Sequence, residues 1–150
     1  MTTAEKRRAV SDSFRRRHEM EQVRFILSDR LEELRGEIEN GCMTGISTDS
    51  DKVQSSGISC TFAGTVDSLD ALERQLKRID SELTMQDRIL EALTDMERDI
   101  FTDTIINHRS EISVSMERLI GERTVRRVKS RALEKASDMA FGDVPTYITF

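Results

Sequence analysis

The stretch LIGERTVRRVKSRALEKA, from Leu119 to Ala136, concentrates positive charge in a chain that is acidic as a whole. It holds six Lys and Arg residues against two Glu residues, so its net charge is +4. Since the whole chain carries −5, the remainder carries −9. The acidic remainder of the chain repels polyanions. A polyanion is therefore expected to bind only at the basic segment, through a single face of the protein.

The spacing of side chains predicts that residues 122–136 form a helix with two unlike faces. At 100° per residue, small apolar side chains gather on one face. They are Val125, Val128, Ala132 and Ala136, with Leu133 beside them. The opposite face is polar and gathers Arg123, Arg126, Arg127, Ser130, Arg131 and Glu134. Such a helix packs its small face against a neighbour and presents guanidinium groups to its surroundings.

A shorter helix is expected before this one, with a tight turn between the two. Ser110 or Ser113 can cap its start, and Gly121 marks the break ahead of the basic helix. Two residues depart from the usual chemistry of such a turn. Leu119 stands where Gly is common, and Gly121 stands where a Ser or Thr cap is usual.

The register of the two helices can be checked from the positions that must be buried. If Val125 and Val128 are the buried residues of the second helix, the first helix needs a small residue ten positions before Val125. Ser115 stands there, Val114 supplies an apolar residue just before it, and Ile120 supplies one in the turn. The sequence therefore predicts that the two helices pack closely through these side chains.

Helical signals also flank this pair. The residues TDME at 94–97 match the capping box, and an amphipathic helix is expected from there to about residue 107. After the basic helix, Gly142 and Pro145 end the periodic pattern. Residues 143–150 form a short tail of β-prone composition.

Two long helices are predicted upstream, over residues 4–39 and 68–93, because Leu and Ile recur at steps of three and four. Residues 40–67 are rich in Gly, Ser and Thr without a sustained period, so they predict a long flexible loop. The simplest packing is an antiparallel hairpin. We therefore expect an all-α chain with a long helical hairpin in 1–93, followed by a small helix-turn-helix domain in 94–142.

A short helix, a tight turn and a basic second helix are typical of the helix-turn-helix, whose second helix enters the major groove of DNA. Arginine suits this position because its fork bonds guanine edges or phosphates. The alternative is that the charged face is only solvated, as in many helical bundles. The N-terminal arginines are either phosphate contacts or solvated residues: Arg7, Arg8, Arg15, Arg16 and Arg17.

The segment from Leu93 onward resembles the last domain of sigma-factor region four, and more closely the phage late-transcription regulators of the RinA and ArpU type. In those families an "L…ER.I" helix leads into a helix-turn-helix ending in "RTV.R" and "AL.KL". The corresponding residues here are Leu93, Glu97, Arg98 and Ile100, then Arg123 to Arg127, then Ala132 to Lys135. The stretch DKVQSS at 51–56 is similar to one in the hairpin loop of related phage proteins. The family's aromatic residue ahead of the helix-turn-helix is missing, with Glu111-Ile112 in its place.

This resemblance implies a sigma-like, DNA-binding regulator of transcription, encoded by a phage or prophage and acting in the cytoplasm of the bacterial host. Its partners would be double-stranded DNA and RNA polymerase. The implied base contacts are Arg123, Thr124, Arg126, Arg127 and Ser130, to which the helical wheel adds Arg131. Helices 15–39 and 68–93 would serve as a surface for homo-oligomers.

Other classes of function are weighed against this one. The sequence contains no Gly-rich phosphate loop, no Cys-x-x-Cys pair and no spacing that suggests a Ser/His/Asp set, so we expect a non-enzyme without metal or cofactor. It contains no apolar run of 18 residues, so we expect a soluble protein without a membrane span. Two alternatives stay open: a small terminase-like DNA-packaging subunit that forms a ring, and a coiled-coil adaptor that binds protein without binding DNA.

Overall fold

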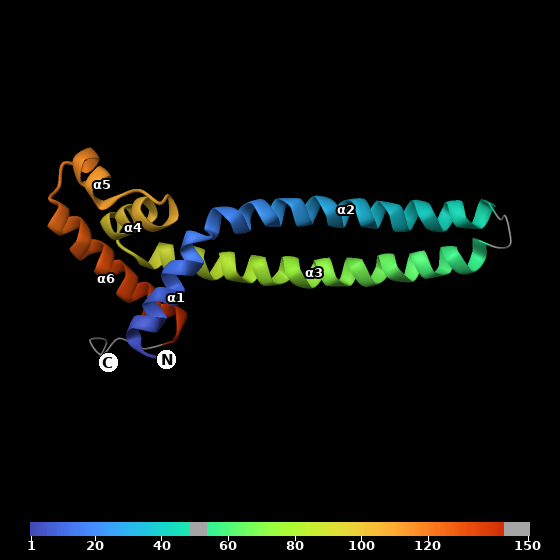
Figure 1. Ribbon diagram of the computed structural model, residues 1–150, viewed down its shortest axis with the longest axis horizontal. Coiled ribbons are helices and arrows are strands. Elements are labelled where there is room, and N and C mark those ends of the chain that lie inside the picture. Colours follow the sequence, from blue (N-terminus) through green and yellow to red (C-terminus); the bar gives the residue numbers. More distant parts are fainter. Residues whose placement is uncertain (49–53, 143–150) are drawn as a thin grey trace. The chain divides into compact units, whose positions relative to one another are not determined.

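The computed structural model describes the backbone of residues 1–48 and 54–142, and their side chains except at 40–63 and 65. Every regular element in this part of the chain is helical, which confirms the predicted all-α class (Figure 1). The elements are α1 (Thr3–Arg15), α2 (Arg17–Thr48), α3 (Gln54–Ala92), α4 (Asp95–Phe101), the π-helical segment η1 (Thr102–Ile106), α5 (Glu111–Arg118) and α6 (Glu122–Ala140). None of these helices is long and apolar enough to cross a membrane. The predicted tail at 143–150 lies outside the described residues.

The chain divides into two compact units, and one is inserted into the sequence of the other. Residues 21–81 form the inserted unit, whereas residues 1–20 and 82–150 together form the second. These limits differ from the predicted boundary between residues 93 and 94. The reason is that α1 packs against α6 and η1, so the two ends of the described chain share one core.

The inserted unit contains α2 from Glu21 onward and α3 as far as Ser81, and the two helices run antiparallel (Figure 1). Two ion pairs record this direction, because rising numbers in α2 meet falling numbers in α3. Arg24 pairs with Asp80, and Arg35 Nη2 lies 3.0 Å from Glu73 Oε1. Leu31 and Leu34 of α2 are buried, and both belong to the apolar positions that recur at steps of three and four.

The single helix predicted for residues 4–39 is interrupted in the structure. Arg16 leaves the helical conformation with φ −90° and ψ 6°, and α2 begins at the next residue. No Gly or Pro marks this break in the sequence. It allows Val10 and Phe14 of α1 to enter the core of the second unit, where they are almost fully buried. Burial of two large apolar side chains outweighs the small local cost of ending a helical turn.

The loop predicted for residues 40–67 is wrong over most of its length. Helix α2 continues to Thr48, and α3 already begins at Gln54, while residues 49–53 lie outside the description. Ser and Thr cost only about 0.5 kcal/mol each in a helix, and extending an existing helix is much easier than starting one. The strongly periodic segments on both sides therefore extend into the polar region.

The second unit is built on two clusters of buried side chains. In the larger one, the rings of Phe14 and Phe101 meet edge to face with centroids 4.8 Å apart. The same cluster contains Val10, Ile89, Leu93, Ile105, Ile106, Ala132 and Ala136. The smaller cluster contains Ile100, Val114 and Val125, with Ile120 and Val128 packed against it. Helix α4 contributes Phe101 to one cluster and Ile100 to the other, so it links the two.

Gln86 interrupts the leucine seam of α3, and the structure gives the reason. Its side chain is fully buried but makes several hydrogen bonds. The amide nitrogen donates to the carbonyl oxygen of Ser13 at 3.2 Å and to its hydroxyl at 2.9 Å, and the amide oxygen accepts from Arg17 Nη1 at 3.2 Å. A glutamine at this position therefore binds the end of α1 to α3 without leaving a buried polar atom unsatisfied.

Candidate functional site

The turn between α5 and α6 is held by Ser115 and by an unusual backbone conformation at Leu119. Leu119 has φ 56° and ψ 41°, which is the left-handed helical region. The amide of Ile120 donates to the carbonyl of Ser115 at 3.2 Å, and the Ser115 hydroxyl donates to the carbonyl of Ile120 at 2.5 Å. Gly121 then caps α6 without a side-chain hydrogen bond, and α6 starts at Glu122 as predicted.

Replacing Leu119 by glycine is expected to stabilise the protein. The Leu119 side chain is 90% exposed, so its removal loses almost no packing. A Cβ atom in the left-handed region destabilises the folded state by about 1–2 kcal/mol, and glycine removes this cost. Glycine also raises the conformational entropy of the unfolded chain, which lowers the free energy of unfolding by about 0.5–1 kcal/mol. We therefore expect a net gain of about 0.5 kcal/mol in urea unfolding. Leu119→Ala keeps the Cβ atom and should give no gain. Equal midpoints for the two variants would contradict this account of the turn.

The smaller buried cluster fixes the angle between α5 and α6. Val114 and Val125 are fully buried against Ile100 of α4, and Ile120 and Val128 pack beside them. This arrangement confirms the register predicted from the sequence, including the positions of Val114 and Ile120. On α6 the buried face is also the predicted one, because Ala132 and Ala136 are fully buried. The side chains on the opposite face of α6 therefore point away from the core.

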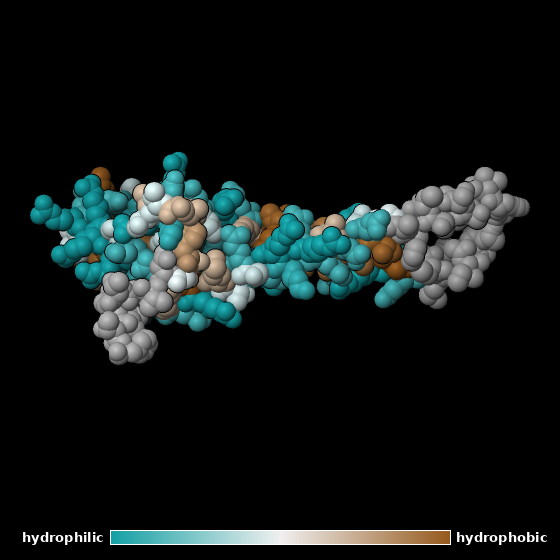
Figure 2. Space-filling view, turned by 90° about the horizontal axis from the view of Figure 1, so that it is seen from below, coloured by the Kyte–Doolittle hydropathy of each residue, from teal (hydrophilic) through white to brown (hydrophobic). Residues whose placement is uncertain are grey.

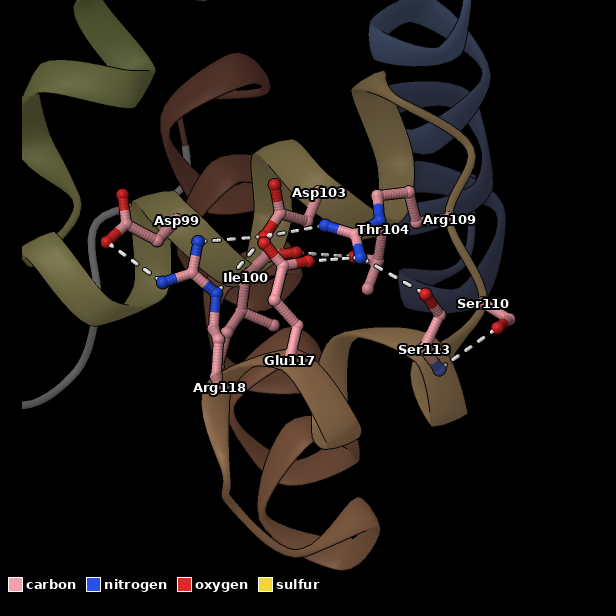
Figure 3. Close-up of polar contacts among 9 residues, drawn as sticks. All are labelled: Asp99, Ile100, Asp103, Thr104, Arg109, Ser110, Ser113, Glu117 and Arg118. Atoms are coloured by element: carbon pink, nitrogen blue, oxygen red, sulfur yellow. Dashed lines mark hydrogen bonds and ion pairs between the residues drawn. The ribbon is translucent and has the colours of Figure 1, made fainter.

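Polar contacts join α5 to α4 and η1 (Figure 3). Arg118 lies between Asp99 and Asp103, with Nη2 at 2.8 Å from Asp103 Oδ2 and Nη1 at 3.5 Å from Asp99 Oδ2. The hydrogen bond to Asp103 raises the pKa of Arg118 above its usual value, and the negative charges of Asp103, Asp99 and Glu117 add to this effect. Arg109 pairs with Glu117 and donates to the Ser113 hydroxyl at 3.1 Å. The first helix of the pair is therefore attached at both ends.

Glu97 attaches α4 to the far part of α6. Its carboxylate accepts from Lys135 Nζ at 3.0 Å to each oxygen, and it completes the predicted capping box with Thr94. Burial raises the pKa of this carboxyl group, but the hydrogen bonds from Lys135 and Thr94 outweigh the burial and lower the pKa overall. The group is therefore charged at neutral pH, and its contribution to folding is lost as the pH falls below about 4.5.

Three of the predicted site residues form an uninterrupted row on the outer face of α6. Arg123, Arg127 and Arg131 are exposed and stand four residues apart. Within the described residues, none of the three has an ion pair or a side-chain hydrogen bond. Ser130 is also exposed on this face. Thr124 is half-buried, so it belongs to the edge of the face.

Arg126 differs from this row because carboxylates already bind it. Its Nε donates to Glu111 Oε2 at 2.7 Å, and its Nη2 donates to Glu122 Oε1 at 2.6 Å. Lys129 Nζ lies 3.3 Å from the other oxygen of Glu111. Hydrogen bonding to Glu111 raises the pKa of Arg126, and the bond from Arg126, reinforced by Lys129, lowers the pKa of Glu111 despite its partial burial.

Sequence reasoning placed Arg126 with the other arginines and missed the role of Glu111. The spacing of four between Glu122 and Arg126 is a signal of a helical ion pair and was readable. The contact with Glu111 was not, because it depends on how α5 packs against α6.

In the residues that the structure describes, no group of three or more His, Cys, Asp or Glu side chains is arranged to hold a metal ion. The chain matches no family model, no curated protein and no solved structure.

Proposed function

We propose that this protein is a double-stranded DNA-binding regulator of transcription that inserts α6 into the major groove. The row of Arg123, Arg127 and Arg131 carries this proposal. Over eight residues it extends along about 12 Å of helix. The surface around α5 and α6 is strongly hydrophilic in Figure 2. The resemblance to phage late-transcription regulators supports a phage or prophage protein that acts in the bacterial cytoplasm and contacts RNA polymerase.

The arrangement suits DNA for two physical reasons. Guanidinium groups without carboxylate partners can bond phosphates or guanine edges without first breaking an ion pair. The opposite face of α6 is fixed by Val125 and Ala132, both fully buried, so the helix is held at a defined angle by its neighbours. A helix that is rigid on one side and cationic on the other is what readout of a groove requires.

The test of this function is fluorescence anisotropy on a random-sequence duplex at several salt concentrations. If three arginines contact phosphates, the logarithm of the binding constant should fall with the logarithm of salt with a slope of about −3. A steep slope would justify selecting the specific site from a pool of random sequences. Absence of binding at low salt would overturn the proposal, and the row of arginines would then be a solvated face.

A second role is favoured for the hairpin. Phe25 and Ile26 of α2 are 69% and 63% exposed, which is unusual for large apolar side chains. Figure 2 shows hydrophobic residues at the surface of this part of the chain. We propose that this surface carries protein–protein contacts, as an oligomer or an adaptor would need. Native mass measurement separates the cases, because a ring of many subunits indicates a terminase-like packaging subunit and a monomer or dimer indicates a regulator.

A further inference from the structure

We infer that Glu111 is a specificity-determining residue that withholds Arg126 and Lys129 of α6 from non-specific DNA. This inference rests on the proposed function. It concerns which cations of α6 are available, and it follows from the contacts between α5 and α6. Glu111 belongs to the first turn of α5, so a residue outside the DNA-reading helix controls part of that helix.

Glu111 holds Arg126 and Lys129 at the same time, and we call this arrangement the clamp. One carboxylate oxygen accepts from Arg126 and the other accepts from Lys129, so two cations of α6 converge on one anion of α5. Glu122 adds a second acceptor for Arg126. The α5 backbone that carries Glu111 is itself fixed, because Val114 is fully buried and Arg118 is bound to Asp103. The carboxylate therefore meets Arg126 at a defined place.

The clamp is weak enough to open. The Glu111 side chain is 27% exposed and that of Arg126 is 64% exposed, and ion pairs with this much access to water contribute little net stability. A phosphate or guanine edge that comes within bonding distance can replace the carboxylate. A polyanion that lies further away cannot, because opening the clamp would break the pair of Arg126 and Glu111 without forming a new one.

Helix α6 therefore holds two kinds of cation. Arg123, Arg127 and Arg131 are open to any phosphate. Arg126 and Lys129 become available only when a ligand atom takes the place of Glu111. Random DNA is bound by Arg123, Arg127 and Arg131 alone. A matching site also binds Arg126 and Lys129. The clamp thus lowers affinity for random DNA more than affinity for the correct site, which raises selectivity.

The role of Glu111 is tested by comparing Glu111→Gln with Glu117→Gln in the full chain. Both changes remove one negative charge from α5, but Glu117 binds Arg109, which is not on α6. On random duplex at low salt, Glu111→Gln should bind several-fold more tightly than Glu117→Gln. Its slope against salt should be steeper by about one to two, because Arg126 and Lys129 both lose the carboxylate of Glu111. Adding Arg126→Gln to Glu111→Gln should cancel most of the gain.

The outcomes distinguish failure of this inference from failure of the proposed function. Equal binding of the two glutamine variants, with wild-type binding intact, would overturn the clamp and leave DNA binding in place. Weaker binding of Glu111→Gln would also overturn it, because Glu111 would then orient Arg126 for contact. If neither the wild type nor Glu111→Gln binds DNA at low salt, both proposals fail. Circular dichroism melting of each variant verifies that its fold is intact.

Discussion

Replacement of Arg123, Arg127 and Arg131 by glutamine is expected to weaken binding to random duplex DNA at least tenfold at low salt. These side chains form the open row of cations on α6, and glutamine preserves helix propensity while removing the charge. Each lost phosphate contact should reduce the slope against salt by about one, so the triple variant should lose nearly all of it. The measurement is the anisotropy titration at several salt concentrations, with circular dichroism to verify the helix content.

The matched control removes the same charge from the inserted unit. Arg74, Lys77 and Arg78 are exposed on α3, and their change to glutamine alters the net charge of the protein equally. We expect the control to bind DNA nearly as the wild type does. If both triple variants lose affinity to the same degree, the net charge of the protein drives binding and α6 is not the reading helix.

The second large effect concerns Phe101, where alanine is expected to destabilise the second unit by about 3–5 kcal/mol. The Phe101 side chain is fully buried and its ring packs edge to face on Phe14, so the change leaves a cavity where α1 meets α4. Hydrogen exchange of the α6 amides reports on this unit separately from the hairpin. Their exchange through unfolding should become at least a hundredfold faster, since each 1.4 kcal/mol is a factor of ten.

Phe25→Ala is the corresponding control, because it makes the same chemical change at an exposed position of α2. Exchange of the α6 amides should be unaffected by it. Slow exchange in Phe101→Ala would mean that α1 and α4 do not form a cooperative unit with α6. In that case the structural support of the proposed DNA-binding face would come from the smaller cluster around Val125 alone.

The helices around α6 were predictable because local signals and packing agree there. The capping box at Thr94, the cap at Ser110 and the small face of α6 are all found as expected. The departure at the turn has a structural counterpart, since Leu119 occupies the left-handed position where glycine is common. In this region a period of 3.6, read together with cap residues, determines both the limits of the helices and their buried sides.

The failures have a common cause, which is that tertiary contacts leave no local signal. The break at Arg16 exists because Phe14 is required in a core formed by residues far along the chain. The pairing of Arg126 with Glu111 likewise joins two helices whose angle is set by burial of Val114 and Val125. The polar composition of residues 40–67 is only a weak preference against helix, and α2 and α3 extend into this segment from both sides.

The inserted position of the hairpin has a consequence for the order in which the protein is made. Helix α1 is synthesised early, but α6, against which it packs, follows about 100 residues later. At translation rates of 5–20 residues per second, α6 is synthesised roughly 5 to 20 s after α1. During this interval the sequences of α2 and α3 are already available to pair with each other. The hairpin can therefore assemble on the ribosome, whereas the arginine row is fixed in place only when α6 arrives.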